Sequence, residues 1–273
     1  EGGIMSEAKD MCRVKHIAGG RDEDKNPVAL RFQKDDYIGQ GKVKISQTFM
    51  NHLQATKDPR IAVFCSLKDG NADPSVQKGL PNGYDKNTIS TNSDYTGKLE
   101  DYSNFNTNVI LREDAPTLLL MPSESKLLQA EAALRNWVAG DPEALYKEAI
   151  RLSMQEQKEA YGVSISEQQV DDYLAQNLFA NAASQEEKLE VLGNEYWVTT
   201  FMNGYESYAN WRRCGYPKLT PTHYAGNESN GQIPRRLPYA IDEYTINKAN
   251  VEQAVQQQGA DNLNTRIWWD VAK

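Results

Sequence analysis

Two adjacent helical patterns, separated by a clear stop and start signal, dominate the middle of the sequence. Apolar residues recur every three or four positions across residues 123–138, and Ser123 is the expected N-cap of this helix. Gly140 ends the pattern, and Asp141 followed by Pro142 is the usual beginning of a second helix. Each helix carries its apolar residues on one face, so we predict that the two form a helical hairpin.

This hairpin spans about 34 residues and has the length and the small-residue pattern of a tetratricopeptide unit. A single unit cannot bury its own apolar face, so other helices must cover it. Further helical patterns occur at residues 46–58, 170–179, 185–202, 205–214 and 247–257. We therefore predict a mainly α-helical fold with tetratricopeptide-like helix pairs, long irregular loops and little β-structure.

The first part of the chain is much richer in loops. Residues 1–45 show one short strand at most, and a buried run is expected at residues 61–64. Residues 68–116 consist largely of Asn, Asp, Gly, Ser, Thr, Tyr and Pro without periodicity, and their aromatic residues argue for a functional loop rather than a disordered one. We predict one domain over residues 1–273, with a binding face in 1–122, a helical scaffold in 123–217 and an irregular C-terminal segment in 218–273.

The charge distribution excludes several kinds of partner. The net charge of the 273-residue chain is −8 with no long block of either sign, so a general attraction to nucleic acid or anionic lipid is not expected. No stretch approaches the roughly 20 apolar residues of a membrane-spanning helix. No Gly-rich phosphate loop occurs, and the stretch DGNADP at residues 69–74 begins like a calcium loop but has Pro74 in place of the required glycine.

The cysteines and histidines predict no metal site and no cofactor. Neither set has the spacing of metal ligands, and the 3 cysteines are too few and too scattered for a disulfide framework. These residues are Cys12, Cys65 and Cys214, and His16, His52 and His223. Their isolation in the sequence favours structural or surface positions.

Cys214 raises the question of a reactive thiolate, because it follows two arginines at the end of a helical pattern. The neighbouring cations would stabilise a thiolate, but the negative end of the helix dipole would destabilise it. A histidine partner would have to come from elsewhere in the fold. We predict that Cys214 is a small buried side chain and not a nucleophile.

Four arginines in two adjacent pairs are predicted to have structural roles. Arg212 and Arg213 lie in a last helical turn, where cations favour the exposed carbonyl groups and can hold a buried carboxylate. The candidate carboxylates are Glu131, Glu195 and Glu206. Arg235 and Arg236, in the stretch IPRRLPY, are expected to form similar ion pairs rather than an anion-binding site.

The loop region suits an uncharged polar ligand such as an oligosaccharide. Aromatic rings cover the apolar faces of a sugar, while amide and carboxylate groups bind its hydroxyls. We predict ligand binding by Asn82, Tyr84, Asp85, Tyr95 and Tyr102. The alternative is a solvated loop whose tyrosines pack onto the helices.

Several ordered motifs closely resemble the C-terminal half of SusD/RagB family proteins. They are DPRIAVF, SKLLQAEAALRNWVAGDPEALYKEAIRLSM, YWVTTFMNGYESYANWRRCGYPKL, IPRRLPYAIDEYTINKANVEQAV and the closing WWD. Together they extend from about residue 58 to residue 270. The resemblance places Cys214 in a helix-ending motif, at a position where the family usually has a small residue such as Thr.

The resemblance implies a non-enzymatic, lipid-anchored protein on the outer-membrane surface of a Gram-negative Bacteroidota bacterium. Such proteins capture oligosaccharides or peptides and close over a SusC-like TonB-dependent transporter. Family members are roughly twice as long as this chain, so the chain is expected to be the C-terminal half of a longer protein, with the lipid anchor outside it. No individual binding residue is carried over from the family.

Without the resemblance, the residues leave two other classes of function open. One is a helical-repeat scaffold that binds another protein, and the other, with less support, is a glycoside hydrolase. A scaffold should tolerate deletion of residues 80–105, whereas a glycan-binding protein should lose its ligand. A hydrolase should release reducing ends from a polysaccharide.

Overall fold

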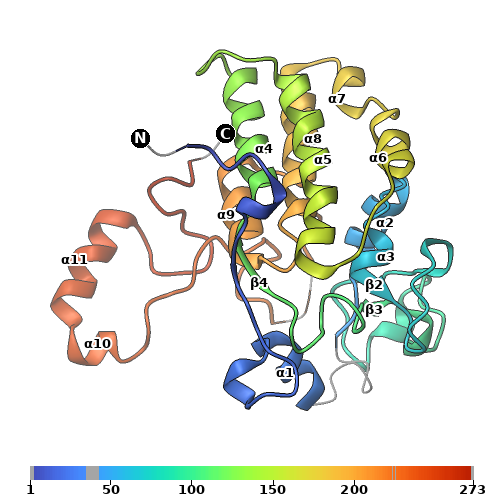
Figure 1. Ribbon diagram of the computed structural model, residues 1–273. Coiled ribbons are helices and arrows are strands. Elements are labelled where there is room, and N and C mark those ends of the chain that lie inside the picture. Colours follow the sequence, from blue (N-terminus) through green and yellow to red (C-terminus); the bar gives the residue numbers. More distant parts are fainter. Residues whose placement is uncertain (1–2, 35–42, 223, 225, 272–273) are drawn as a thin grey trace.

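Helices are the main regular structure of the computed structural model, which describes residues 3–34, 43–222, 224 and 226–271. Helix α4 (Pro122–Leu134) and helix α5 (Pro142–Tyr161) form the predicted hairpin, and α8 (Gln185–Thr199) and α9 (Gly204–Cys214) lie against it (Figure 1). The prediction of a mainly helical fold is confirmed. His223 lies outside the described residues.

The helix starts show how far local sequence signals reach. The side chain of Asp141 accepts hydrogen bonds from the N–H groups of Glu143 and Ala144, as expected for the cap of α5. The prediction of Ser123 as the N-cap of α4 is wrong. This helix begins at Pro122 with Met121 as N-cap, because proline suits the first helical position and Glu124 accepts the N–H of Met121 at 3.4 Å.

Two helix ends also differ from the prediction. Helix α4 ends at Leu134, four residues before the expected end of the pattern at 138. The single helix expected over residues 170–179 is two short ones, α6 (Glu167–Leu174) and α7 (Leu178–Asn181). Asn177 separates them with a φ of 51°, a left-handed conformation that asparagine tolerates better than most residues. The sequence pattern therefore identified helical residues in this region but did not show that the helix is interrupted at Asn177.

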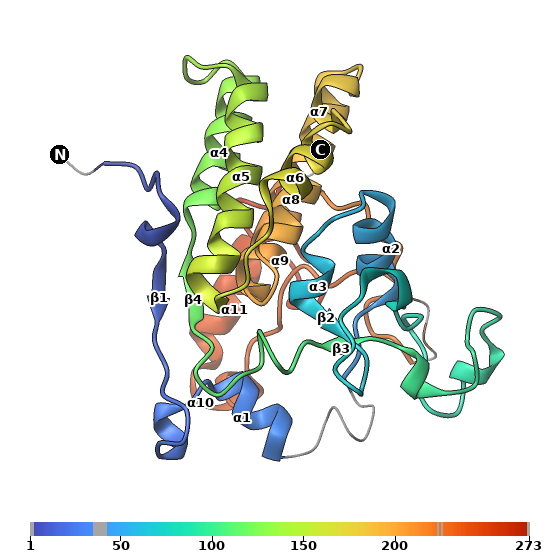
Figure 2. The same cartoon turned by 45° about the vertical axis from the view of Figure 1, so that its right-hand side comes forward.

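The N-terminal half contains short elements joined by long loops. Helix α2 (Gln47–Ala55) lies within the predicted helical pattern at residues 46–58, is capped by Ser46, whose side chain accepts the N–H of Phe49, and is followed by α3 (Ile61–Phe64). Helix α1 (Pro27–Lys34) was not predicted. The strands make two antiparallel pairs: β1 (Cys12–Val14) with β4 (Thr117–Leu120), and β2 (Cys65–Ser66) with β3 (Asn104–Phe105). Figure 2 shows part of the 68–116 loop, in teal to green, extending away from the helices.

The apolar core has two main parts. One lies among α4, α5, α6, α7 and α8, and the other joins α2 and α3 to residues 110–111 and the end of α8. Phe49 connects the second part to Phe201 and Trp197, with ring centroids 4.8 Å and 4.9 Å apart. After residue 218 the chain forms α10 (Glu243–Ile246), which was not predicted, and α11 (Lys248–Gln258), which matches the helical pattern at residues 247–257; Figure 1 shows both to the left of the helical bundle.

A buried acidic pair lies where α4 begins. Burial raises the pKa of Glu124 to about 7, and the nearby carboxylates of Glu206 and Glu156 add to this effect. Burial also raises the pKa of Glu156 to about 6, although Ser123 donates hydrogen bonds to both of its oxygens. Both values lie above the ordinary 4.5. The folded state therefore holds these protons more tightly than the unfolded state, and the stability that they provide is lost as pH rises from about 4.5 to about 7.

We expect Glu124→Gln to flatten this pH dependence. The variant should gain on the order of 2 kcal/mol in free energy of unfolding at pH 8, because it removes a buried charge, and little at pH 4.5. Urea denaturation at both pH values measures the difference. Glu167→Gln is the matched control, since the Glu167 side chain is 83% exposed. An equal gain at both pH values would show that burial of the Glu124 charge is not the cause.

Candidate ligand-binding site

The loop that carries the predicted ligand-binding residues starts from a fixed base. The N–H of Leu80 donates to the carbonyl of Ile45, and the N–H of Gln47 donates to the carbonyl of Leu80, both at 2.8 Å. A Cβ atom at Gly79 would lie 2.4 Å from the Cα of Gln47, so only glycine permits this close approach. These contacts hold the start of the loop against the first turn of α2, and so they fix the position from which residues 82–85 continue.

A cavity of about 390 Å³ lies between this loop, the first turn of α2 and the segment after residue 219. Its lining consists of Asn82, Gly83 and Tyr84, of Gln47 and Thr48, and of Thr220, Pro221 and Thr222. Tyr84 is 42% exposed. Within the described part of the chain, neither Asn82 nor Tyr84 forms a side-chain hydrogen bond. An exposed ring and uncommitted polar groups thus face one space.

Asp85 joins the two segments that form this cavity. One carboxylate oxygen accepts a hydrogen bond of 2.6 Å from the Tyr224 hydroxyl, and the other accepts the N–H groups of Asn87 and Thr88. The hydrogen bond from Tyr224, followed by those from Asn87 and Thr88, lowers the pKa of Asp85 to about 2. Asp85 does not line the cavity. Its geometry suits a residue that positions Tyr84 rather than one that contacts the ligand.

The other two predicted residues lie elsewhere in the loop. Tyr102 is 0% exposed, and its hydroxyl donates to the carbonyl of Asp94 and accepts the N–H of Thr96, both at 2.9 Å. Tyr95 is half-buried and stacks on Tyr102 with ring centroids 5.8 Å apart. Because the Tyr102 ring is enclosed, the prediction that it contacts a ligand is wrong, and its contacts hold the loop together. A role for Tyr95 stays a prediction, away from the cavity.

The arginine at position 213 forms a two-pronged ion pair. Its terminal nitrogens donate to the two oxygens of Glu131 at 2.8 Å and 2.7 Å, which joins α9 to α4. Burial opposes the charge on Glu131, but Arg213 and Arg135 outweigh it and lower the pKa of this carboxyl. Cys214 beside it is buried. Arg213 thus contacts Glu131, which was one of its three candidate carboxylates in the sequence.

The remaining arginines fix the C-terminal segment. Arg212 lies between the rings of Tyr208 and Trp269, at 4.2 Å and 4.6 Å, and donates to the carbonyl of Arg235 rather than to a carboxylate. Arg235 lies 3.4 Å from Asp270, and Arg236 lies 2.7 Å from Asp261. None of these contacts places an arginine in the cavity beside Tyr84.

A buried charged network was not predicted from the sequence. Arg60, with no exposed side-chain surface, donates to both oxygens of Asp58 and to the hydroxyl of Ser153. Its second terminal nitrogen lies 2.8 Å from Glu195 without hydrogen-bond geometry, and Tyr173 donates to the other oxygen of Glu195. Burial opposes the Arg60 charge, but Asp58 and Glu195 outweigh it and raise the pKa of Arg60. These groups are enclosed, so the network joins elements and does not form an active site.

Comparisons with known proteins decide the family. Residues 1–240 match a family described as SusD-like, "starch-binding associating with outer membrane". This chain belongs to the SusD-like family. The family is non-catalytic, which agrees with the expectation that the chain is not an enzyme. No helix in the described part of the chain is long and apolar enough to cross a membrane, and no metal-binding group of side chains gathers there.

Solved structures of SusD-like proteins share the fold over nearly the whole chain. A chitin-binding protein is 28% identical with a TM-score of 0.81, over 99% of this chain and 57% of that one. A chitin-binding SusD homologue from Flavobacterium johnsoniae is 25% identical with a TM-score of 0.74, over 99% of this chain and 56% of that one. A SusD homologue from Bacteroides fragilis is 24% identical with a TM-score of 0.77, over 99% of this chain and 59% of that one. No curated protein matches the sequence.

These lengths bear on the expected size of the protein. The chain spans 56% to 63% of the length of the first structures that it matches. This agrees with the resemblance to part of a SusD-like protein. Activity, ligands and partners of the whole protein are therefore matters for proposal.

Proposed function

We propose that this SusD-like chain captures oligosaccharides in the cavity beside Tyr84 and, as part of a lipid-anchored protein on the outer-membrane surface, delivers them to a SusC-like TonB-dependent transporter. One observation carries the binding part of the proposal. An exposed aromatic ring, two amide side chains and three threonines meet in one cavity of about 390 Å³. Two of the similar structures are named as chitin-binding, which makes chitin-type oligosaccharides the first ligands to test.

The chemistry of the cavity suits a neutral sugar. The ring of Tyr84 can cover the apolar face of a pyranose, and the amides of Asn82 and Gln47 can bind hydroxyl or acetamido groups. The described lining contains no carboxylate. Glycoside hydrolysis normally needs two carboxyl groups beside the scissile bond, so the cavity supports capture and not cleavage. A captured ligand favours a closed, transport-ready state only through contacts that it makes better in that state.

We expect Tyr84→Ala to weaken oligosaccharide binding about threefold to tenfold, which corresponds to the loss of one aromatic stacking contact. Titration calorimetry with chitooligosaccharides and malto-oligosaccharides measures the affinity. Tyr205→Ala is the matched control, because Tyr205 is 91% exposed on α9 and does not line the cavity. Equal weakening by both substitutions, or none with Tyr84→Ala, would place the binding site elsewhere.

A further inference from the structure

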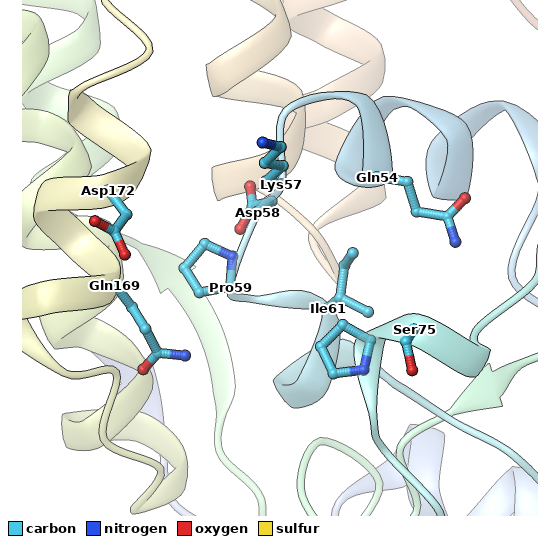
Figure 3. A pocket seen from close by; sticks show the side chains of 9 residues that line it. Gln54, Lys57, Asp58, Pro59, Ile61, Ser75, Gln169 and Asp172 are labelled. Carbon is cyan, nitrogen blue, oxygen red and sulfur yellow. The ribbon is translucent and has the colours of Figure 1, made fainter.

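A second and larger cavity, of about 580 Å³, lies on another face of the α2–α3 region. Figure 3 shows its walls: Gln169 and Asp172 from α6 on one side, and the turn after α2 with Lys57 above. Pro59, Ile61 and Pro74 give the cavity an apolar surface, and Figure 3 shows Pro59 between the two α6 side chains and Ile61. Its volume falls in the range of small-molecule sites, and no residue of the oligosaccharide cavity lines it.

Lys57 occupies an unusual backbone position at the mouth of this cavity. The N–H of Lys57 donates to the carbonyl of Gln54, and the N–H of Asp58 donates to the carbonyl of Leu53. This pair of hydrogen bonds is the Schellman ending of a helix, in which glycine is the usual residue at the position of Lys57. Lys57 has a φ of 48°, which costs free energy for any residue with a Cβ atom. A strained backbone conformation at a residue that lines a cavity is an indication of function.

Three charged residues line the cavity, and one of them, Asp58, is already paired with the buried Arg60. Among the residues that the structure describes, neither Lys57 nor Asp172 forms an ion pair. Asp172 accepts one hydrogen bond, from Gln168 on its own helix. The side-chain oxygen of Gln169 accepts the N–H and hydroxyl of Ser166, which leaves the amide nitrogen, shown toward the cavity in Figure 3, as a free donor. The cavity thus offers separate positive and negative groups across an apolar floor.

We propose that this cavity binds a small zwitterion, a free amino acid or a dipeptide with apolar side chains. The ammonium group of the ligand pairs with Asp172. Its carboxylate pairs with Lys57 and accepts a hydrogen bond from Gln169, while its apolar side chains lie on Pro59, Pro74 and Ile61. A neutral sugar would leave both charges without a partner, so the chemistry differs from that of the cavity beside Tyr84. The proposal does not depend on the oligosaccharide site.

The test is calorimetric titration of the 273-residue chain with L-leucyl-L-leucine at low salt. Acetylation of the dipeptide amine or amidation of its carboxylate should each lower the affinity about threefold to tenfold, because each removes one ion pair. Amidation of the dipeptide carboxylate should no longer lower its affinity for the Lys57→Gly variant. Acetylation of the dipeptide amine should no longer lower its affinity for the Asp172→Asn variant. Lys57→Gly should also leave the melting temperature unchanged or raise it, because glycine relieves the strained φ.

Two control variants separate this site from other effects. Lys15→Ala removes an exposed lysine near β1 and should leave dipeptide binding unchanged. Tyr84→Ala should also retain dipeptide binding, because Tyr84 lines the other cavity. Absence of dipeptide binding up to about 10 mM would overturn the proposal. It would equally be overturned if Lys57→Gly kept the preference for a free carboxylate, or if a neutral oligosaccharide bound with the same dependence on Lys57 and Asp172.

Discussion

Arg60→Met is expected to lower the free energy of unfolding by about 3–5 kcal/mol, because it leaves the buried carboxylates of Asp58 and Glu195 without their cation. Methionine fills a similar volume, so the effect reports lost charge pairing more than a cavity. A domain has only about 5–15 kcal/mol of stability in total, so the variant should be close to unfolding. Urea denaturation followed by circular dichroism measures the loss.

Arg151→Met is the matched control for this prediction. Arg151 also contacts two carboxylates, but its side chain is 44% exposed. Water stabilises the charges that its removal leaves behind, so we expect a loss of at most about 1 kcal/mol. If the free energy of unfolding fell by similar amounts in the two arginine variants, the enclosed network around Arg60 would not be a principal structural contact of the fold.

The Arg60 network also shows where sequence reasoning stops. Hydrogen bonds from Arg60 and Tyr173 connect the start of α3, α5, α6 and α8, and Arg60 and Ser153 are 93 residues apart. In the sequence, Arg60 is an ordinary charged residue before an apolar run. Its burial depends on the way the helices meet, and no local pattern records that. Caps such as Asp141 were predictable because the groups that they satisfy lie within the next few residues.

The candidate ligand-binding site shows the same division. Composition alone drew attention to Asn82 and Tyr84, because amides and exposed aromatics are local properties of the loop. The opposite wall, at residues 220–222, could not be predicted, since the hydrogen bond between Asp85 and Tyr224 spans 139 residues. Tyr102 was assigned wrongly for a related reason. An aromatic residue in a polar loop can face a ligand or hold the loop together, and only its burial distinguishes the two.

Gly193→Ala is expected to destabilise the protein by about 1–3 kcal/mol, although alanine is the better helix former. Gly193 lies within α8, and a Cβ atom there would be 2.4 Å from the Cβ of Tyr216 and 3.4 Å from the sulfur of Cys214. Carbon atoms cannot approach to 2.4 Å without a shift, so the segment after α9 must move away from α8. The helix-propensity gain of about 1 kcal/mol is too small to offset the loss of that packing.

Gly204→Ala tests the argument in the opposite direction. Gly204 is the first residue of α9, and a Cβ atom there would meet nothing within 4 Å. The substitution should therefore be neutral or stabilising. In thermal denaturation, the melting temperature of Gly193→Ala should fall below that of the parent protein, and the melting temperature of Gly204→Ala should be equal to it or higher. Stabilisation by Gly193→Ala would mean that α8 and the Cys214–Tyr216 turn are not packed closely. The ion pair of Arg213 with Glu131 would then be the principal contact that holds the end of α9 against the bundle.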